Sequence, residues 1–254
     1  MRTVFGVVRQ IQSLVGRLPI VGGSEAASGA QVRPLAAGRR PLLGDGLGEQ
    51  RRGGARLDQV DGTTCGSAVL IALTAWADPA ETLRLDGEQR GGSAAGSGGA
   101  GTAVTSGARA GVAAGFGARY NARQREVHRE STRFWPQALG TTPWGMVRWL
   151  RRNAPAAGPY RVRFVDDVSA ADLEPALDAA RAALTAGRPV PMLVGQPLAP
   201  RHYVMALGVL DDGQWRVYEP TSGHVKALDL RLVRERRLAR VLGFDRLHAL
   251  FLPI

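Results

Sequence analysis

The stretch YVMALGVLDDGQWRVY, residues 203–218, decides the fold. It begins with an apolar run and ends with a second strand-like run, Gln214–Tyr218, and the sequence Asp211-Asp-Gly213 between them is typical of a tight turn. The pattern predicts an antiparallel hairpin. Because the strands of a hairpin run in opposite directions, the start of one lies beside the end of the other. His202 and Glu219 are therefore expected to meet at one end of a sheet.

Further strands and helices are predicted on both sides of the hairpin. The stretches predicted as strands are 160–165, 190–194, 225–230 and 247–252. The stretches predicted as helices are 65–76, 142–152, 169–187 and 231–242. Because helices come first and strands later, the chain is predicted to be an α+β protein with an N-terminal helical part and a C-terminal antiparallel sheet.

The first 56 residues are predicted to be an amphipathic helix followed by a flexible linker. Apolar residues from Val4 to Leu18 share one helical face, and residues 19–56 are rich in Gly, Pro, Ala and Arg without a clear period. Three interpretations of the helix remain open: a helix packed on its own domain, a membrane-surface helix, or a prosegment that covers a cleft. In the third case, deletion of residues 1–56 is expected to raise activity.

Residues 57–254 are predicted to form one globular domain, interrupted by a mobile insertion at 87–118. In that insertion 20 of 32 residues are Gly or Ala. No run of 18 apolar residues occurs, and polar residues such as Arg9 and Gln12 interrupt the N-terminal apolar stretch, which is unlike a secretory signal. We therefore expect no transmembrane segment and a cytoplasmic location.

The net charge of +11 does not predict a nucleic-acid partner. Of the 33 basic residues only Lys226 is a lysine, a bias typical of a bacterial GC-rich genome. The charges are spread along the chain and form no basic stripe, so dedicated nucleic-acid binding is not expected. No His, Cys or Gly pattern fits a metal or phosphate site, and no cofactor is predicted. His128 is expected on a solvated face, His224 on the surface and His248 in a structural role.

Cys65 is the clearest candidate for a chemically reactive residue. A single cysteine forms no internal disulfide, so it is either a small buried apolar group or a nucleophile. It begins the apolar run 65–76, and a helix N-terminus favours a thiolate. Gly66 is expected to leave space beside the sulfur. The amide of Gln59, six residues upstream, is a candidate donor to an oxyanion, with His202 as acid and base and Glu219 as the group that orients it.

These residues resemble the papain-like cysteine peptidases. Gln59 followed after five residues by Cys65-Gly-Ser-Ala-Val-Leu70 is most similar to the bacterial branch that removes double-glycine leader peptides. Residues 202–209 and 215–223 resemble the His and acid strands of that branch, and the likeness covers about 57–76 and 140–254. Relatives mostly carry Asp or Asn where this chain has Glu219, and Gly62-Thr-Thr64 replaces a common Asp.

The resemblance implies a papain-like fold and a catalytic set of Gln59 as oxyanion donor, Cys65 as nucleophile, His202 as general acid and base and Glu219 as orienting group. The predicted function is a cysteine hydrolase, foremost a peptidase, acting on a peptide or protein substrate. One alternative is a thiol acyltransferase or deamidase that uses the same residues. The other is an inactive papain-like binding protein, in which Cys65→Ala leaves the biological role intact.

Overall fold

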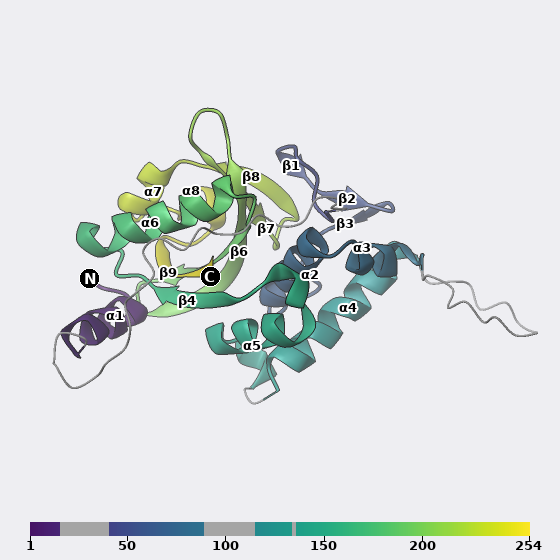
Figure 1. Ribbon diagram of the computed structural model, residues 1–254, viewed down its shortest axis with the longest axis horizontal. Helices are drawn as coiled ribbons and strands as arrows, with labels where there is room; N and C mark the ends of the chain where they lie inside the picture. Colours follow the sequence, from purple (N-terminus) through teal and green to yellow (C-terminus); the bar gives the residue numbers. More distant parts are fainter. Residues whose placement is uncertain (16–40, 89–114, 134–135) are drawn as a thin grey trace, which may run out of the picture.

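The computed structural model describes residues 1–15, 41–88, 115–133 and 136–254 (Figure 1). Most helices precede the large sheet in the chain, so the predicted α+β class is confirmed. The α-helices are α1 Val4–Val15, α2 Cys65–Ala77, α3 Pro79–Asp86, α4 Phe116–Ser131, α5 Pro143–Asn153, α6 Ala170–Thr185, α7 Leu230–Arg234 and α8 Ala239–Leu242. Short 3-10 turns occur at Gln137–Leu139 and Pro155–Ala157.

The main sheet has seven strands in the order β1-β8-β7-β6-β5-β9-β4, and every neighbouring pair is antiparallel. The strands are β1 Gly48–Glu49, β4 Tyr160–Phe164, β5 Val190–Gln196, β6 Ala199–Val209, β7 Trp215–Glu219, β8 His224–Leu228 and β9 Arg246–Pro253. A small separate hairpin joins β2 Arg51–Arg52 to β3 Ala55–Arg56. The run β5 to β8 is a meander, and β9 returns to lie between β5 and β4.

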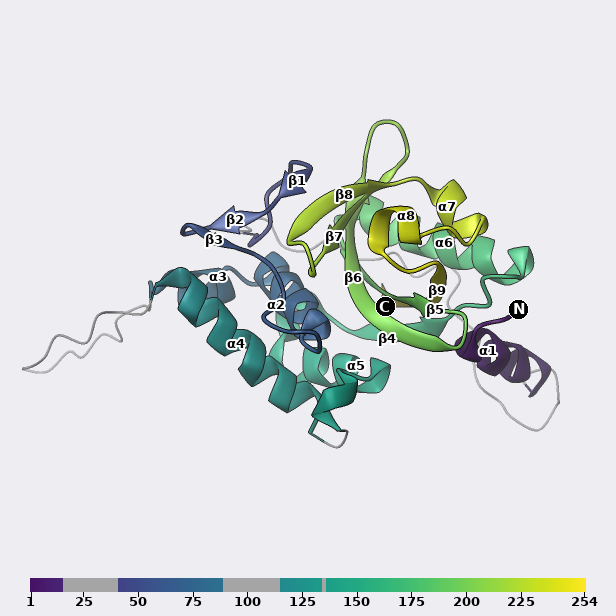
Figure 2. The same cartoon turned by 180° about the vertical axis from the view of Figure 1, so that it is seen from behind.

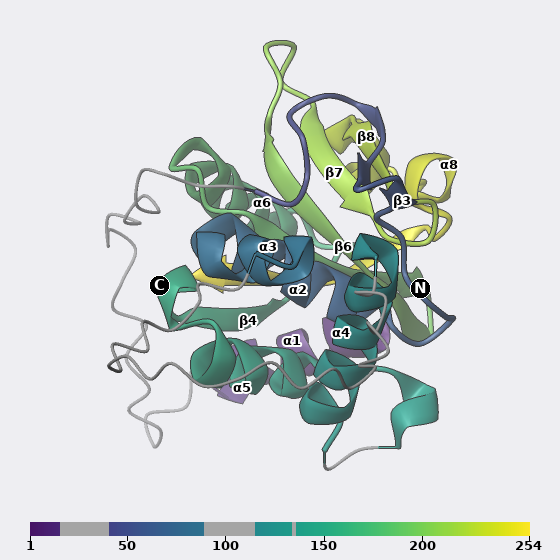
Figure 3. The same ribbon diagram turned by 90° about the vertical axis from the view of Figure 1, so that its right-hand side faces the viewer.

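The curved sheet separates two helical layers (Figures 1, 2 and 3). Helices α2 to α5 lie on one side, and α6, α7 and α8 lie on the other. Alternation along β6 supplies both cores: Tyr203, Met205 and Leu207 belong to the first, and Val204 and Ala206 belong to the second. None of the described helices is long and apolar enough to cross a membrane.

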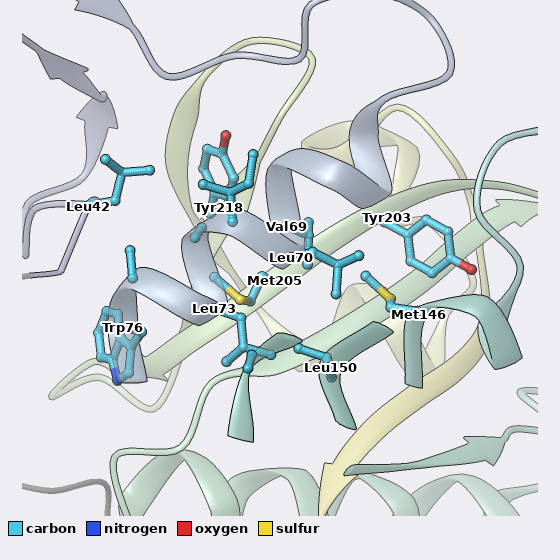
Figure 4. Packing of buried hydrophobic residues seen from close by; sticks show 14 of the residues in the cluster. Leu42, Val69, Leu70, Leu73, Trp76, Met146, Leu150, Tyr203, Met205 and Tyr218 are labelled. Carbon is cyan, nitrogen blue, oxygen red and sulfur yellow. The ribbon is translucent and has the colours of Figure 1, made fainter. Parts of the chain in front are cut away.

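Helix α2 occupies the centre of the first core. Every residue from Cys65 to Trp76 is buried, as expected for a helix that is apolar on all sides. Figure 4 shows Leu70 and Leu73 among Met146 and Leu150 of α5 and Met205 of β6, which belong to the same buried cluster. The sheet, α4 and α5 therefore hold α2 from several directions and leave it little freedom to move.

Part of the predicted linker is packed on the domain. Leu42 and Leu43 are buried in the first core, and β1 pairs with β8, with Gly48 opposite Val225. Strands of two residues are too short to show the alternation that identifies strands in a sequence, so the sequence pattern predicts a linker here. Residues 16–18 of the predicted helix, 19–40 of the predicted linker and 89–114 of the predicted insertion lie outside the described residues, and 116–118 begin α4.

Two other regions differ from the sequence-based expectation. The predicted helix 231–242 is two short helices, because Arg236 adopts a left-handed backbone conformation with φ of 56° just after α7 ends. Helices α3 and α4 are absent from the sequence-based prediction, and charged residues dominate α4. It is held by a buried ion pair of 2.7 Å between Arg123 and Glu81 of α3, and it buries Val127 and His128.

A substitution in the central helix α2 tests this packing. Leu70→Ala is expected to lower the free energy of unfolding by about 2–5 kcal/mol, because the methyl groups of a fully buried leucine are lost and a cavity remains. Leu47→Ala is the matched control: its side chain is 53% exposed, and the expected change is below about 0.5 kcal/mol. Urea denaturation measures both, and equal losses would contradict the central position of α2.

Candidate active site

Cys65 is the first residue of α2 and is buried, with a free thiol. The hydrogen-bond ladder of the helix begins with the Ala68 N–H, which donates to the Thr64 carbonyl at 3.0 Å. The amides of the first helical turn therefore have no helical acceptor and point toward the N-terminal end. In the preceding loop, the carboxylate of Asp61 accepts hydrogen bonds from the backbone and hydroxyl of Thr63 at 2.8 and 2.7 Å. The thiol thus lies at the positive end of a rigidly held helix.

Gly66 serves close packing. A Cβ atom at this position would lie 3.1 Å from Thr141 and 3.3 Å from Tyr203. The hydroxyl of Tyr203 in turn donates to the Thr141 carbonyl at 2.9 Å. The space beside Gly66, which the sequence suggested was open for a substrate, is therefore filled by two side chains of the protein. This close approach sets the position of the α2 N-terminus against β6.

His202 and Glu219 are in direct contact. Nε2 of His202 lies 2.8 Å from Oε1 of Glu219, and both side chains are 5% exposed. His202 lies inside β6, and Glu219 is the last residue of β7. The antiparallel register that places Met205 opposite Tyr218 brings the two side chains to the same end of the sheet.

The Cys65 thiol lies close enough to the His202 imidazole to act on it, because hydrogen bonding and charge interaction with Cys65 are among the causes that raise the pKa of the imidazole. Nε2 of the same ring faces Glu219. The structure therefore brings three of the four candidate residues together, with Cys65 and Glu219 both acting on His202.

The Glu219 carboxylate is surrounded by donors. Besides His202, Oε1 accepts a hydrogen bond from the Thr221 N–H at 2.7 Å. Oε2 accepts from the N–H and hydroxyl of Ser222 at 3.0 and 2.7 Å, and Nζ of Lys226 lies 3.3 Å away. Five donors on one carboxylate stabilise its ionised form and fix its orientation.

These contacts shift the protonation of both partners. Burial would lower the pKa of His202, but the hydrogen bonds and charges of Cys65 and Glu219 outweigh burial and raise that pKa from 6.5 to about 9. Burial would raise the pKa of Glu219, but hydrogen bonds from His202, Ser222 and Thr221 hold it well below its usual range. At neutral pH the pair is an imidazolium next to a carboxylate.

Gln59 connects the loop before α2 with the turn after β7. Its backbone N–H donates to the Pro220 carbonyl at 2.8 Å, and its Oε1 accepts a hydrogen bond from Thr221 at 3.3 Å. Its Nε2 donates to the Asp61 carbonyl at 2.7 Å. Within the described residues, none of its hydrogen bonds reaches Cys65. The predicted oxyanion donor therefore lies in the loop before Cys65, with one amide hydrogen engaged by Asp61.

A cavity of about 600 Å³ opens at Cys65. Residues of α1, α2, α5, β5, β6 and the loops before α2, α5 and β9 line it. They are Phe5, Gly62, Thr63, Cys65, Ala138, Gly140, Thr141, Thr142, Pro143, Trp144, Leu193, Pro200, Arg201, Tyr203 and Phe244. The volume lies in the range of small-molecule and peptide side-chain sites.

Sequence reasoning missed two residues that contact the site. Lys226 is the chain's one lysine, and its Nζ lies 3.3 Å from the Glu219 carboxylate. The ring of Phe244 lies 5.7 Å from that of His202 between centroids and helps to cover the imidazole. No sequence pattern marks Phe244, because the loop before β9 approaches β6 only in the folded chain.

The other histidines lie outside this arrangement. His128 was expected on a solvated face but is 7% exposed, because α4 turns that side toward the core. His248 is buried in β9, with Nε2 2.9 Å from the Gln196 carbonyl, and His224 begins β8 with Nδ1 2.7 Å from the Ser222 carbonyl. Among the described residues, no three His, Cys, Asp or Glu side chains converge as a metal site would require.

No protein-family model and no curated protein matches the chain.

The His202–Glu219 contact predicts a pH-dependent stability. A raised pKa means that the bound proton stabilises the fold fully below pH 6.5, and that this contribution is lost as the pH rises through about 9. Glu219→Gln removes the charge that holds the proton. Between these pH values, the wild type is therefore expected to lose about 1–3 kcal/mol more unfolding free energy than this variant.

Urea denaturation at a series of pH values measures this difference. Lys226→Met is the matched control, because it removes another partner of the same carboxylate and keeps the His202 contact, so it should retain most of the alkaline loss. If the wild type and Glu219→Gln lose the same stability, His202 does not hold its proton through Glu219.

Proposed function

We propose that the chain is a papain-like cysteine hydrolase that cleaves peptide or amide bonds. The observation that carries the proposal is the arrangement of Cys65 and Glu219 around His202, with the thiol at the N-terminus of a buried helix. A thiol nucleophile, an imidazole in contact with it and a carboxylate that orients the imidazole are the groups that acyl transfer through cysteine needs.

Each group has a role in the proposed reaction. The Cys65 sulfur attacks the carbonyl carbon, and the proton held by His202 passes to the leaving amine, which departs as a thioester forms. A water molecule then gives a proton to His202 and attacks the thioester, which releases the acid and restores the thiolate–imidazolium pair. Glu219 keeps its charge throughout and stabilises the imidazolium.

The oxyanion formed in each attack needs donors. The N–H groups at the start of α2 supply one set, because the helix itself leaves them without acceptors. The side-chain amide of Gln59 has two hydrogens, and the hydrogen bond to Asp61 uses one of them. In the proposal, the second hydrogen stabilises the oxyanion together with the Cys65 N–H.

The departures from the papain-like pattern are compatible with this chemistry. Glu219 is one methylene longer than the Asp or Asn of most relatives. The turn that follows β7 accommodates the longer side chain, because Thr221 and Ser222 donate to both carboxylate oxygens while His202 keeps its 2.8 Å contact. Orientation of the imidazole is therefore supported in this chain without Asp or Asn.

Alkylation of Cys65 tests the proposed nucleophile. Because Cys65 is the only thiol, intact mass reports labelling at that site alone. The rate of reaction with iodoacetamide at pH 6 is expected to fall by at least about tenfold in His202→Ala, since the imidazolium that stabilises the thiolate is lost.

The matched control for this measurement is His224→Ala. This variant removes a nearby imidazole that does not belong to the Cys65, His202 and Glu219 set, and it should react like the wild type. Circular dichroism checks that both variants fold. Equal rates in the wild type and His202→Ala would mean that the thiol is not activated, which favours the binding-protein interpretation.

Turnover is the second test. The full chain is expected to hydrolyse an unfolded protein substrate such as denatured casein, and Cys65→Ser should reduce the rate by at least about a thousandfold. Mass spectrometry of the products separates the related reactions: new peptide termini indicate a peptidase, released ammonia a deamidase, and acylated amine acceptors a transferase. An activated thiol without any of these products would contradict the hydrolase proposal.

A further inference from the structure

The cavity at Cys65 has walls that favour an apolar occupant. Its aromatic and aliphatic side chains are contributed by segments far apart in the sequence, among them Phe5, Trp144, Leu193, Tyr203 and Phe244. Leu193 and Tyr203 are almost fully buried, whereas Trp144 is 61% exposed. A volume of about 600 Å³ is enough for a large side chain together with adjoining backbone.

The cavity also carries an unbalanced charge. Arg201 is the one charged side chain among the lining residues, and no carboxylate lines the cavity in the part of the chain that the structure describes. Arg201 is exposed, and no described residue forms an ion pair or hydrogen bond with its guanidinium. A guanidinium in this setting favours the binding of a carboxylate and disfavours the binding of a cation. The net charge of +11 also attracts acidic molecules to the protein.

The cavity wall places this charge on the same cavity as the thiol. Arg201 lies two residues before Tyr203 on β6, at the bulge in the β5–β6 pairing, and both residues line the cavity together with Cys65. Tyr203 also lines the cavity and packs against the residue next to Cys65. A carboxylate that pairs with Arg201 therefore belongs to a molecule that occupies the same cavity as the Cys65 sulfur.

The N-terminal helix is a fixed wall of this cavity. Phe5 of α1 stacks on Phe164, with ring centroids 4.5 Å apart. Ion pairs from Arg2 to Asp166 at 2.8 Å and from Arg9 to Asp172 at 3.0 Å anchor the helix at two points. The cavity volume of about 600 Å³ is that of the structure with α1 present, so α1 forms part of the wall and leaves the cavity open.

We propose that this cavity binds the bulky apolar side chain of an acidic peptide, and that Arg201 pairs with a carboxylate of the same peptide. This inference rests on the proposed function, because it assumes that the scissile bond of the peptide lies at Cys65. It adds a substrate class, with Arg201 as a specificity-determining residue and Phe5 as part of the apolar wall.

Labelling of Cys65 by a matched series of reagents tests the proposal. The probes are iodoacetamide, N-benzyl-iodoacetamide and its benzyl derivatives with a para carboxylate or a para aminomethyl group. Each rate is divided by the rate of the same reagent with glutathione. The benzyl group is expected to raise the relative rate by at least about tenfold, and the carboxylate by about a further fivefold over the aminomethyl group.

Two arginine variants identify the source of the charge preference. Arg201→Gln should abolish the advantage of the carboxylate and keep that of the benzyl group. The matched control is Arg181→Gln, which removes an exposed arginine on α6, on the other side of the sheet, and should retain both advantages. A wild type without benzyl or carboxylate preference, or an Arg201→Gln variant that keeps the carboxylate preference, would overturn the proposal.

A binding measurement separates failure of this inference from failure of the proposed function. If iodoacetamide labels the wild type no faster than His202→Ala, the proposed nucleophile fails, and the cavity is then tested by calorimetry of Cys65→Ser with N-acetyl-phenylalanyl-aspartyl amide. Binding that weakens about fivefold in an added Arg201→Gln substitution supports the cavity proposal by itself. No binding, or binding indifferent to Arg201, overturns the cavity proposal.

Discussion

The packing of α2 against β6 is the constraint on which the rest of the structure depends. Helix α2 carries Cys65 and β6 carries His202, so the distance between thiol and imidazole is set by how closely the helix approaches the sheet. Gly66 permits that approach, because a side chain there would press on Thr141 and Tyr203. The apolar residues that follow Cys65 are buried on all sides, and this burial holds the helix in place.

Burial of a charged pair in this position has to be offset by hydrogen bonds. His202 and Glu219 are both about 5% exposed, and removing such groups from water disfavours their charged forms. The turn after β7 offsets that cost, since the donors of Thr221 and Ser222 converge on the carboxylate. The orientation of the imidazole therefore depends on a turn and a strand register as much as on the two residues themselves.

The segments that enclose the site come from both ends of the chain. Phe5 in α1 and Phe244 before β9 line the same cavity as Cys65. Residues 41–56, assigned from the sequence to a linker, contribute Leu42 and Leu43 to the core and a strand to the sheet. A deletion of residues 1–56 would thus remove core packing together with α1, so it is a poor test of whether the N-terminal helix restrains activity.

The amino-acid sequence by itself determined the α+β class, the hairpin and the buried helix, because each rests on local apolar periodicity and turn residues. Hairpin geometry alone also brought His202 near Glu219, since strand direction decides which residues face each other. Only the tertiary structure decided the contact of Cys65 with His202, the hydrogen bonds of Gln59 to the Glu219 turn and the cavity with Arg201 at its wall. Those depend on how α1, α2 and the loop before β9 pack on the sheet, and packing between distant segments leaves no periodic signal in a single sequence.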